Sequence, residues 1–192
     1  MTTPVVETEQ FYIVPLTQRQ LKKYTLTDYS LEADLGVKPI PREVPPALKE
    51  ALEVMLLPTI DGLFKIQVFF TLWTIIHKEE NVIVGDLCFK GEPNEAGEIE
   101  VGYGIYDDFQ NRGYMTEALR GLVYWAFEQP RVTCVVAETE KDNIASQRTL
   151  QKLNFEQYLE KEGMLWWQLK PSGAAGSTRS FLKKRSFNRA RY

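Results

Sequence analysis

The residues whose types and spacing point to chemistry lie mainly in one segment, residues 98–119, which reads EIEVGYGIYDDFQNRGYMTEAL. Here a strand-like run passes through a polar turn into a helix with apolar residues at helical spacing. Arg112 and Gly113 stand directly before this helix. A helix start leaves up to four backbone N–H groups without intrahelical partners and carries the positive end of the helix dipole. Because a glycine lets a ligand approach the backbone, the segment predicts a site for a diphosphate group.

Other nucleotide-binding motifs do not fit this chain. A Walker A sequence, GxxxxGK followed by Ser or Thr, does not occur in it. Gly102 and Gly104 begin like the dinucleotide motif GxGxxG, but the third position is Asp107 and both glycines lie within the strand-like run. On the residues alone, a glycine-assisted helix start that binds no ligand stays open as an alternative.

Residues 110–115, QNRGYM, resemble the Q/R-x-x-G-x-G/A motif with which GNAT-superfamily N-acetyltransferases bind the pyrophosphate of acetyl-CoA. The run around them is similar to the ribosomal-protein N-acetyltransferase branch of the RimJ/RimL type. Residues 143–146 (NIAS) and 152–155 (KLNF) are similar to the family's NxxS…KxGF helix and the strand after it. The resemblance implies an N-acetyltransferase with acetyl-CoA as co-substrate, no metal, and a primary amine as acceptor.

The same resemblance implies roles for individual residues. Glu100 matches the position of the branch's proposed general base, and Ser146 would protonate or orient the leaving thiolate. Two alternatives stay open. Glu100 is then a solvated strand glutamate without a catalytic role, and Asn143 is a plain helix N-cap that binds no ligand. The residues implied to bind the cofactor are Tyr103, Ile105, Gln110, Asn111, Arg112, Gly113, Tyr114, Met115, Thr116 and Asn143.

Three positions depart from the family pattern. Met115 replaces a small residue, so it either crowds the loop or faces the core as the first residue of the apolar stripe. Asn154 replaces a glycine, and asparagine tolerates the positive φ that this turn needs. Leu150 stands where many members carry a tyrosine acid, which indicates another proton donor.

The elements that position these residues follow from apolar periodicity and from turn residues. Together with the resemblance they predict an α/β (α+β) GNAT fold, a mixed and mostly antiparallel central sheet of about six to seven strands flanked by helices. Helices are expected over 17–24, 47–57, 114–128 and 144–153, and strands over 11–15, 68–76, 82–89, 98–105, 132–137, 155–159 and 164–169.

Composition favours one globular domain with an extension. The chain has 192 residues, 23 basic and 26 acidic, for a net charge of −3. Residues 171–192 hold six basic residues and no acid behind a Gly/Ser/Ala linker, so we expect an acetyltransferase domain over 1–170 and a basic extension over 171–192. The extension is either solvated, bound weakly to an acidic partner such as RNA, or docked on its own acidic body.

Several classes of function are excluded by what the chain lacks. His77 is its one histidine, which argues against Cys/His zinc sites, and no GxSxG sequence presents a hydrolase serine. We expect His77 to be a surface turn residue, and Cys88 and Cys134 to be buried thiols in a reducing compartment. Residues 63–76, the longest apolar stretch, are too short to cross a bilayer, and the N-terminus lacks a signal-peptide pattern. The expected location is therefore the cytoplasm.

The acceptor is not fixed by the sequence. A protein or peptide N-terminus, a polyamine, an antibiotic and an amino acid all fit, and both a monomer and a homodimer stay open. Neither a membrane partner nor nucleic acid is expected, apart from weak binding through the basic extension. The alternative to an enzyme is a noncatalytic acyl-CoA-binding or interaction module of the same fold. Aromatic residues Phe69, Phe70 and Trp73 are expected in the core rather than in the acceptor site.

Overall fold

The structure is a computed structural model that describes residues 4–53 and 67–171. The helix expected over 47–57 is therefore described only in part: it begins at Pro46, with a proline at its first position, and its regular α-helical portion ends at Ala51. The basic extension lies outside the described residues beyond Pro171, so its boundary and its role stay predictions.

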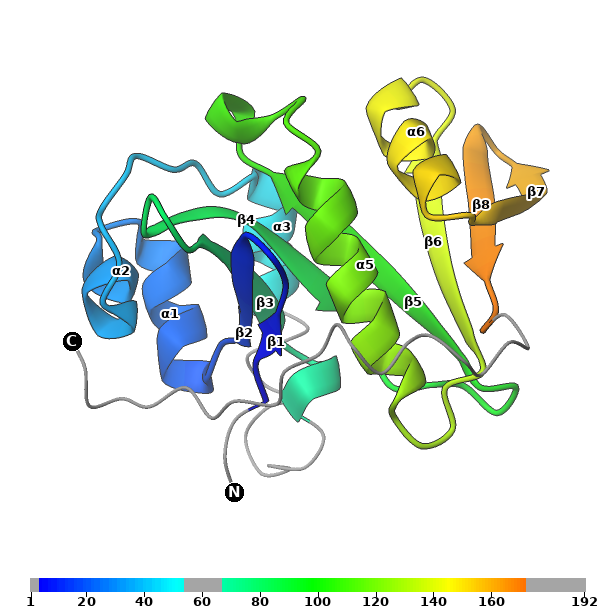
Figure 1. The fold of residues 1–192 in the computed structure, drawn as a ribbon, viewed down its shortest axis with the longest axis horizontal. Helices are drawn as coiled ribbons and strands as arrows, with labels where there is room; N and C mark the ends of the chain where they lie inside the picture. The colour runs from blue at the N-terminus through cyan, green and yellow to red at the C-terminus, as the bar shows by residue number, and fades with distance from the viewer. Residues whose placement is uncertain (1–3, 54–66, 172–192) are drawn as a thin grey trace.

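One mixed sheet of eight strands forms the centre of the molecule (Figure 1). Its spatial order is β1-β2-β3-β4-β5-β6-β8-β7, and every neighbouring pair is antiparallel except β5 and β6. The strands are β1 (Val6–Glu7), β2 (Phe11–Pro15), β3 (Leu72–His77), β4 (Val82–Phe89), β5 (Glu98–Ile105), β6 (Cys134–Glu140), β7 (Glu156–Lys161) and β8 (Met164–Leu169).

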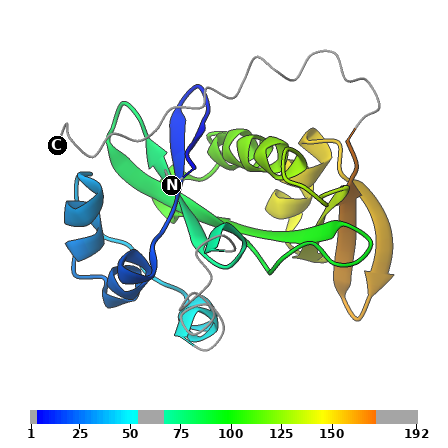
Figure 2. The ribbon, with the colours of Figure 1, turned by 90° about the horizontal axis from the view of Figure 1, so that it is seen from below.

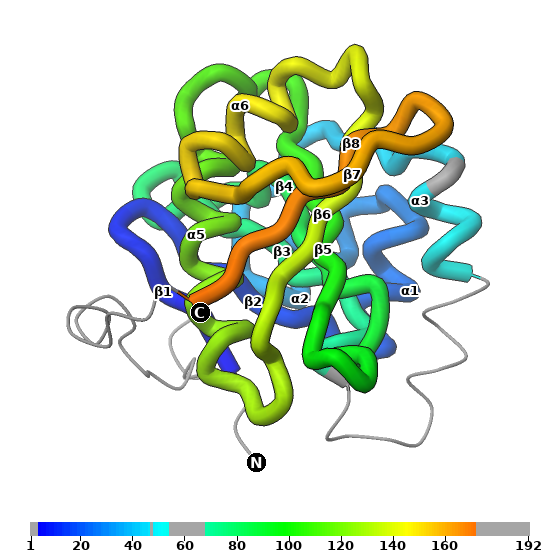
Figure 3. The backbone as a smooth tube through the Cα atoms, turned by 90° about the vertical axis from the view of Figure 1, so that its right-hand side faces the viewer, coloured from blue at the N-terminus to red at the C-terminus, as the bar shows by residue number. Residues whose placement is uncertain are grey.

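Helices cover both faces of this sheet. Figure 2 shows α5 (Tyr114–Phe127) and α6 (Ile144–Lys152) on one face, and α1 (Gln18–Leu26), α2 (Ser30–Leu35) and α3 (Pro46–Ala51) on the other. Helix α5 is the crossover between the parallel strands β5 and β6, as a parallel pair requires. Beyond β5 in the sheet, the strands β6, β8 and β7 lie side by side, and α6 lies next to them (Figure 3).

The two helical layers bury separate apolar clusters. The stripe of α5 packs onto the sheet as its periodicity predicts, with Met115, Ala118, Leu119, Leu122, Val123 and Ala126 all buried. On the opposite face, α1 begins with a reciprocal capping box between Thr17 and Gln20 and buries Leu21 and Tyr24. The expected fold is confirmed, and α5 is anchored along its whole length.

Some local expectations were wrong. The strand predicted from Val68 starts only at Leu72, because residues 67–69 form a 3-10 turn. The short strand β1 and the helix α2 were not predicted, since neither is long enough to show a period, and β1 brings the sheet to eight strands.

His77 is another correction, because it is buried rather than exposed in a turn. It ends β3 at 5% exposure, and its ring packs against those of Phe11 and Tyr114 at centroid distances of 5.5 and 5.2 Å. Its Nδ1 atom accepts a hydrogen bond from the backbone N–H of Glu80. Trp73, by contrast, lies in the core as expected.

Candidate active site

An open strand edge lies where β5 and β6 separate. The two strands pair only from Glu98–Glu100 to residues 134–136, although both continue well beyond, and they diverge in Figure 1. The carbonyl of Glu100 and the N–H of Tyr106 bond toward β4. Since backbone groups alternate sides along a strand, Tyr103 and Ile105 direct their N–H and C=O groups toward the open edge.

The start of α5 is open as well. Gly113 is its N-cap residue, with a φ of 78°, and no side chain among the described residues caps it. A Cβ atom at Gly113 would meet nothing of the described chain within 4 Å. The first amides of the helix, at Tyr114, Met115 and Thr116, have no intrahelical partner.

Side chains around this loop hold its shape. The Arg112 guanidinium donates to the carbonyl of Asp108 at 2.9 Å and lies 4.0 Å from the carboxylate of Glu80. The Gln110 amide donates to Asp107 at 2.7 Å, and Asn111 adopts a positive φ of 61°. The loop is thus shaped largely by its own short-range contacts.

Of the residues implied to bind acetyl-CoA, Met115 and Tyr114 turn their side chains inward. Met115 is 8% exposed and packs in the core, so the longer side chain does not crowd the loop. The Tyr114 ring packs on Phe11 at 5.1 Å. The backbone N–H groups of these two residues lie in the first turn of α5.

Helix α6 places Ser146 beside a tyrosine from β5. The hydroxyl oxygens of Tyr103 and Ser146 are 2.6 Å apart, and burial raises the pKa of Tyr103 to about 12. Asn143 caps α6, its side-chain oxygen accepting from the Ser146 N–H at 3.0 Å. Leu150 is fully buried, so the missing tyrosine is replaced by core packing. Asn154 has the expected positive φ, 63°.

Glu100 lies on the other face of β5 from the Tyr103 side chain. Its carboxylate forms an ion pair with Lys90, whose ammonium also lies 3.5 Å from Glu138. Burial lowers the pKa of Lys90, but the two carboxylates raise it more, and the net direction is upward. The proposed base and the proposed thiolate partner therefore flank β5 from opposite sides.

A pocket of about 890 Å³ opens on the face covered by α1–α3. Five stretches of chain contribute to its lining: α1 with the loop after it, residues 40–48, the start of β3, β4, and β5 with the turn that follows. Gly104 leaves room there, because a Cβ atom on it would meet nothing of the described residues within 4 Å.

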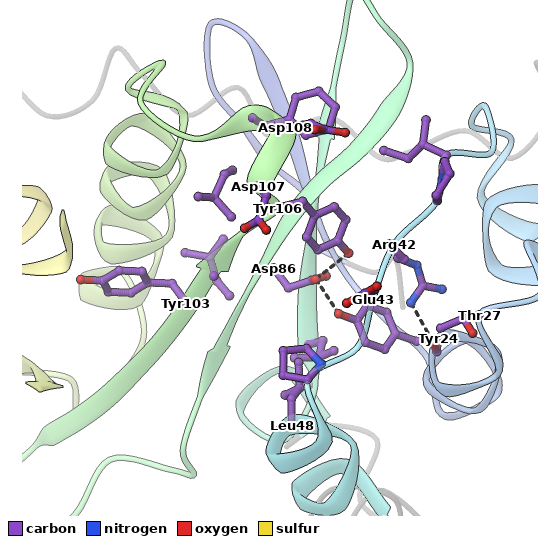
Figure 4. A pocket seen from close by; sticks show the side chains of 18 of the residues that line it. Tyr24, Thr27, Arg42, Glu43, Leu48, Asp86, Tyr103, Tyr106, Asp107 and Asp108 are labelled. Atoms are coloured by element: carbon purple, nitrogen blue, oxygen red, sulfur yellow. Dashed lines mark hydrogen bonds between the residues drawn. The ribbon is translucent and has the colours of Figure 1, made fainter. Parts of the chain in front are cut away.

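A buried carboxylate, Asp86, lies at the wall of this pocket (Figure 4). Its Oδ2 atom accepts hydrogen bonds from the hydroxyls of Tyr24 and Tyr106, both at 2.8 Å, and Oδ1 accepts from Thr74 at 2.9 Å. Burial raises the pKa of Asp86, although the three hydroxyl donors oppose that shift. Figure 4 also shows Tyr103 pointing away from this group.

Arg42 closes one side of the pocket. It stacks over the Tyr24 ring at 4.3 Å, donates to the Tyr24 carbonyl at 2.7 Å, and pairs with Glu32 at 3.1 Å. The side chains of Arg42 and Glu32 are each only 2% exposed. Such a pair holds the passage at residues 40–48 against α1 and α2.

No function was predicted from the sequence for Asp86, Tyr24 or Arg42. One signal does exist: Asp86 is the sole charged residue in the apolar run 82–89. Tyr106 stands at the start of the polar turn after β5, and its hydroxyl reaches back to Asp86. Cys88, expected to be buried, is half-buried on the pocket wall, whereas Cys134 is buried, and both are free thiols.

Within residues 4–53 and 67–171, no three His, Cys, Asp or Glu side chains are grouped so that they could hold a metal ion. Over the same ranges, no helix is long and apolar enough to cross a membrane.

The chain is similar in sequence to known N-acetyltransferases. The uncharacterized N-acetyltransferase YjdG of Bacillus subtilis is 40% identical over 86 residues, which are 45% of this chain and 51% of YjdG. The chain spans about half the length of the curated relatives it matches.

Solved structures share the fold at low identity. The ribosomal-protein-S5-alanine acetyltransferase from Vibrio fischeri superimposes with a TM-score of 0.62 at 18% identity, covering 88% of this chain and 97% of that one. RimL, a ribosomal L7/L12 alpha-N-protein acetyltransferase solved in complex with coenzyme A, gives 0.60 at 15% identity, covering 86% and 97%. The model of the acetyltransferase (GNAT) domain matches residues 40–156, and the chain belongs to this family.

Proposed function

We propose that this protein transfers the acetyl group of acetyl-CoA to a primary amine. The observation that carries the proposal is the open edge of β5 leading to the uncapped start of α5. The backbone groups of Tyr103 and Ile105 suit the amides of a pantetheine arm added like a strand. The amides at 113–116, with the Arg112 charge, suit a pyrophosphate.

The remaining loop and cap residues complete this binding site. Gln110 and Asn111 shape the loop, and Thr116 offers a hydroxyl in the first turn of α5. Asn143 uses its side-chain oxygen for the α6 cap, so its part in binding falls to its amide NH₂ group.

Glu100 serves in this proposal as general base for the amine. An amine must be neutral to attack a thioester, which at pH 7 costs about 1 kcal/mol for a protein α-amine and roughly 4–5 kcal/mol for a lysine. A carboxylate within reach of the amine, directly or through one water, lowers that barrier. The Lys90 ammonium must move aside before the Glu100 carboxylate takes the proton.

Ser146 and Tyr103 act on the leaving sulfur by hydrogen bonding. A phenol with a pKa of about 12 is too weak an acid to yield its proton to a thiolate, whose pKa is about 8.5. The Tyr103 hydroxyl instead fixes Ser146, whose hydroxyl then donates toward the sulfur. The proton that the thiolate finally takes comes from solvent.

Calorimetric titration with acetyl-CoA, followed by a thiol-release assay on a panel of amines, tests this function. We expect micromolar-range binding and acetyl-dependent thiol release. The absence of binding at millimolar acetyl-CoA would refute both the site and the reaction.

Two observations favour the alternative of a noncatalytic acyl-CoA-binding module. Leu150 carries no hydroxyl, and Glu100 is held in an ion pair. Binding of acetyl-CoA without thiol release from any amine would establish this alternative.

The class of acceptor also remains a proposal. RimL and the S5-alanine enzyme are named for protein acceptors, which supports a protein N-terminus here, and a small-molecule amine is the second class. Action in the cytoplasm stays a prediction from the sequence.

A further inference from the structure

The charged side chains that line the pocket on the α1–α3 face are mainly acidic. Its charged lining consists of four carboxylates and one guanidinium, namely Glu43, Asp86, Asp107, Asp108 and Arg42. No other cation lines it among the described residues. The guanidinium is buried and paired with Glu32, and only its Nη2 atom has no hydrogen-bond partner among the described residues. Asp86 is buried, whereas Glu43, Asp107 and Asp108 are exposed, so a positively charged ligand is favoured most at the Asp86 end, where the surroundings are least hydrated.

The hydroxyls on the pocket wall are oriented to accept hydrogen bonds. A tyrosine hydroxyl has one proton, and both Tyr24 and Tyr106 give theirs to Asp86. Their oxygens therefore offer only lone pairs to a ligand. An ammonium group, with N–H donors and no acceptor, complements this arrangement, whereas a ligand carboxylate would meet lone pairs and like charge.

The space beside this group is open because of a glycine. Gly104 is the cross-strand partner of Asp86, and the position of its absent Cβ atom is unfilled by the described residues. Farther out, Ile40, Pro45 and Leu48 add apolar lining that suits a methylene chain. Gly104 and Glu100 are four residues apart, so this end of the pocket lies about 13 Å along β5 from the proposed base.

We propose that the Asp86 end of this pocket binds a positive charge of the acceptor, so that the preferred substrates are primary amines with a second cationic group on an apolar chain. The inference rests on the proposed function, because the other amine of the substrate must reach the acetyl thioester.

Matched amines that differ only at the far end test the preference. The four-carbon set is 1,4-diaminobutane, butylamine and 4-aminobutanoate, and the eight-carbon set repeats it with 1,8-diaminooctane, octylamine and 8-aminooctanoate. At saturating acetyl-CoA, we expect kcat/KM for the better diamine to exceed that of its monoamine at least tenfold, with the amino acid poorest. Values within threefold across each set, or an amino acid that equals its diamine, would overturn the inference.

A binding measurement separates this inference from the proposed function. Each amine is titrated calorimetrically into protein saturated with coenzyme A, so that no turnover is needed. Diamine binding with the same order of preference supports the pocket even where no thiol is released. Failure to bind coenzyme A or acetyl-CoA counts against the proposed function. If the coenzyme A-saturated protein binds all the amines equally, or binds none of them, that result counts against the inference.

Substitutions locate the effect. Asp86→Asn should reduce the preference for diamine over monoamine at least fivefold while the acetyl-CoA Kd changes less than twofold. Should Asp86→Asn fail to fold, the double variant Glu43→Gln/Asp108→Asn at the rim carries the same expectation. Glu95→Gln, which removes an exposed acid from the β4–β5 loop, is the control and should leave the preference intact. An unchanged preference in the folded pocket variants would refute the assignment.

Discussion

The two sides of β5 are built in different ways. On the side proposed to bind acetyl-CoA, here called the donor side, the loop at 110–113 and the first turn of α5 are contiguous in sequence and offer mainly backbone amides. On the side proposed to bind the amine, here called the acceptor side, Tyr24 meets Asp86 across 62 residues of chain, and a buried ion pair supports the pocket wall. Every acetyl-CoA molecule carries the same pyrophosphate, so a site for it can consist of neighbouring backbone amides. A site that distinguishes one amine from another depends on side chains that tertiary packing brings together.

The largest expected effect tests whether the Glu100 carboxylate on β5 acts as the general base. Glu100→Gln should lower kcat/KM by about 10²–10⁴-fold if Glu100 is the base. Glu98→Gln is the matched control, since it lies on the same face of the same strand but is exposed and bonded to Asn94. Rates of Glu100→Gln within a few-fold of wild type across pH 6–9 would remove Glu100 from the mechanism.

Removing one charge from the pocket wall should lower the free energy of unfolding more than removing one from the exposed surface. Arg42→Met leaves the buried Glu32 carboxylate without its partner, and we expect the free energy of unfolding to fall by about 3–5 kcal/mol. The comparison is Arg19→Met, which breaks the pair with Asp34 where Arg19 is 71% exposed, and whose effect should stay within about 1 kcal/mol. Urea denaturation measures both, and equal losses would mean that the buried pair does not hold the wall.

Acetyl-CoA binding on the donor side should depend on the backbone conformation at Gly113. Gly113→Ala and Gly163→Ala both place alanine at a positive φ, 78° and 81°, with no described atom within 4 Å of the new Cβ. Each should cost a similar 1–2 kcal/mol or so of stability. Only Gly113→Ala should weaken acetyl-CoA binding, by about tenfold in Kd, or roughly 1.4 kcal/mol. Calorimetric Kd values that change equally in both variants would contradict a phosphate site at α5.

The smallest effect concerns the hydroxyl pair of Tyr103 and Ser146, which we propose to act on the sulfur of the leaving group. Tyr103→Phe and Ser146→Ala each remove one hydrogen-bond partner, worth about 0.5–1.5 kcal/mol, and should lower kcat between twofold and tenfold. If the two hydroxyls act as one unit, the double variant is no slower than the slower single variant.

The raised pKa of Tyr103 also predicts how the contribution of this pair to the rate depends on pH. With its pKa raised to about 12, Tyr103 keeps its proton at lower pH, so the ratio of wild-type to Tyr103→Phe rates should stay flat from pH 7 to 10. A ratio that falls toward 1 over that range would show that the phenol ionises far earlier.

The elements that we propose to bind acetyl-CoA could be predicted, because their signals are local. The stripe of α5, the glycine before it and the positive φ of Asn154 each follow from a few neighbouring residues. The same local view failed for His77, whose polar neighbours suggested a turn although packing on Phe11 and Tyr114 buries it.

The sequence by itself determined the layered α/β fold and the position of the helix start at Gly113, since periodicity and turn residues act over one or two turns of chain. Only the tertiary structure decided that Met115 faces the core and that Tyr103 reaches Ser146. It also decided that Asp86 gathers hydroxyls from α1, β3 and the end of β5. Those contacts depend on strand register and helix packing, which join residues far apart in the chain and leave no spacing pattern to read.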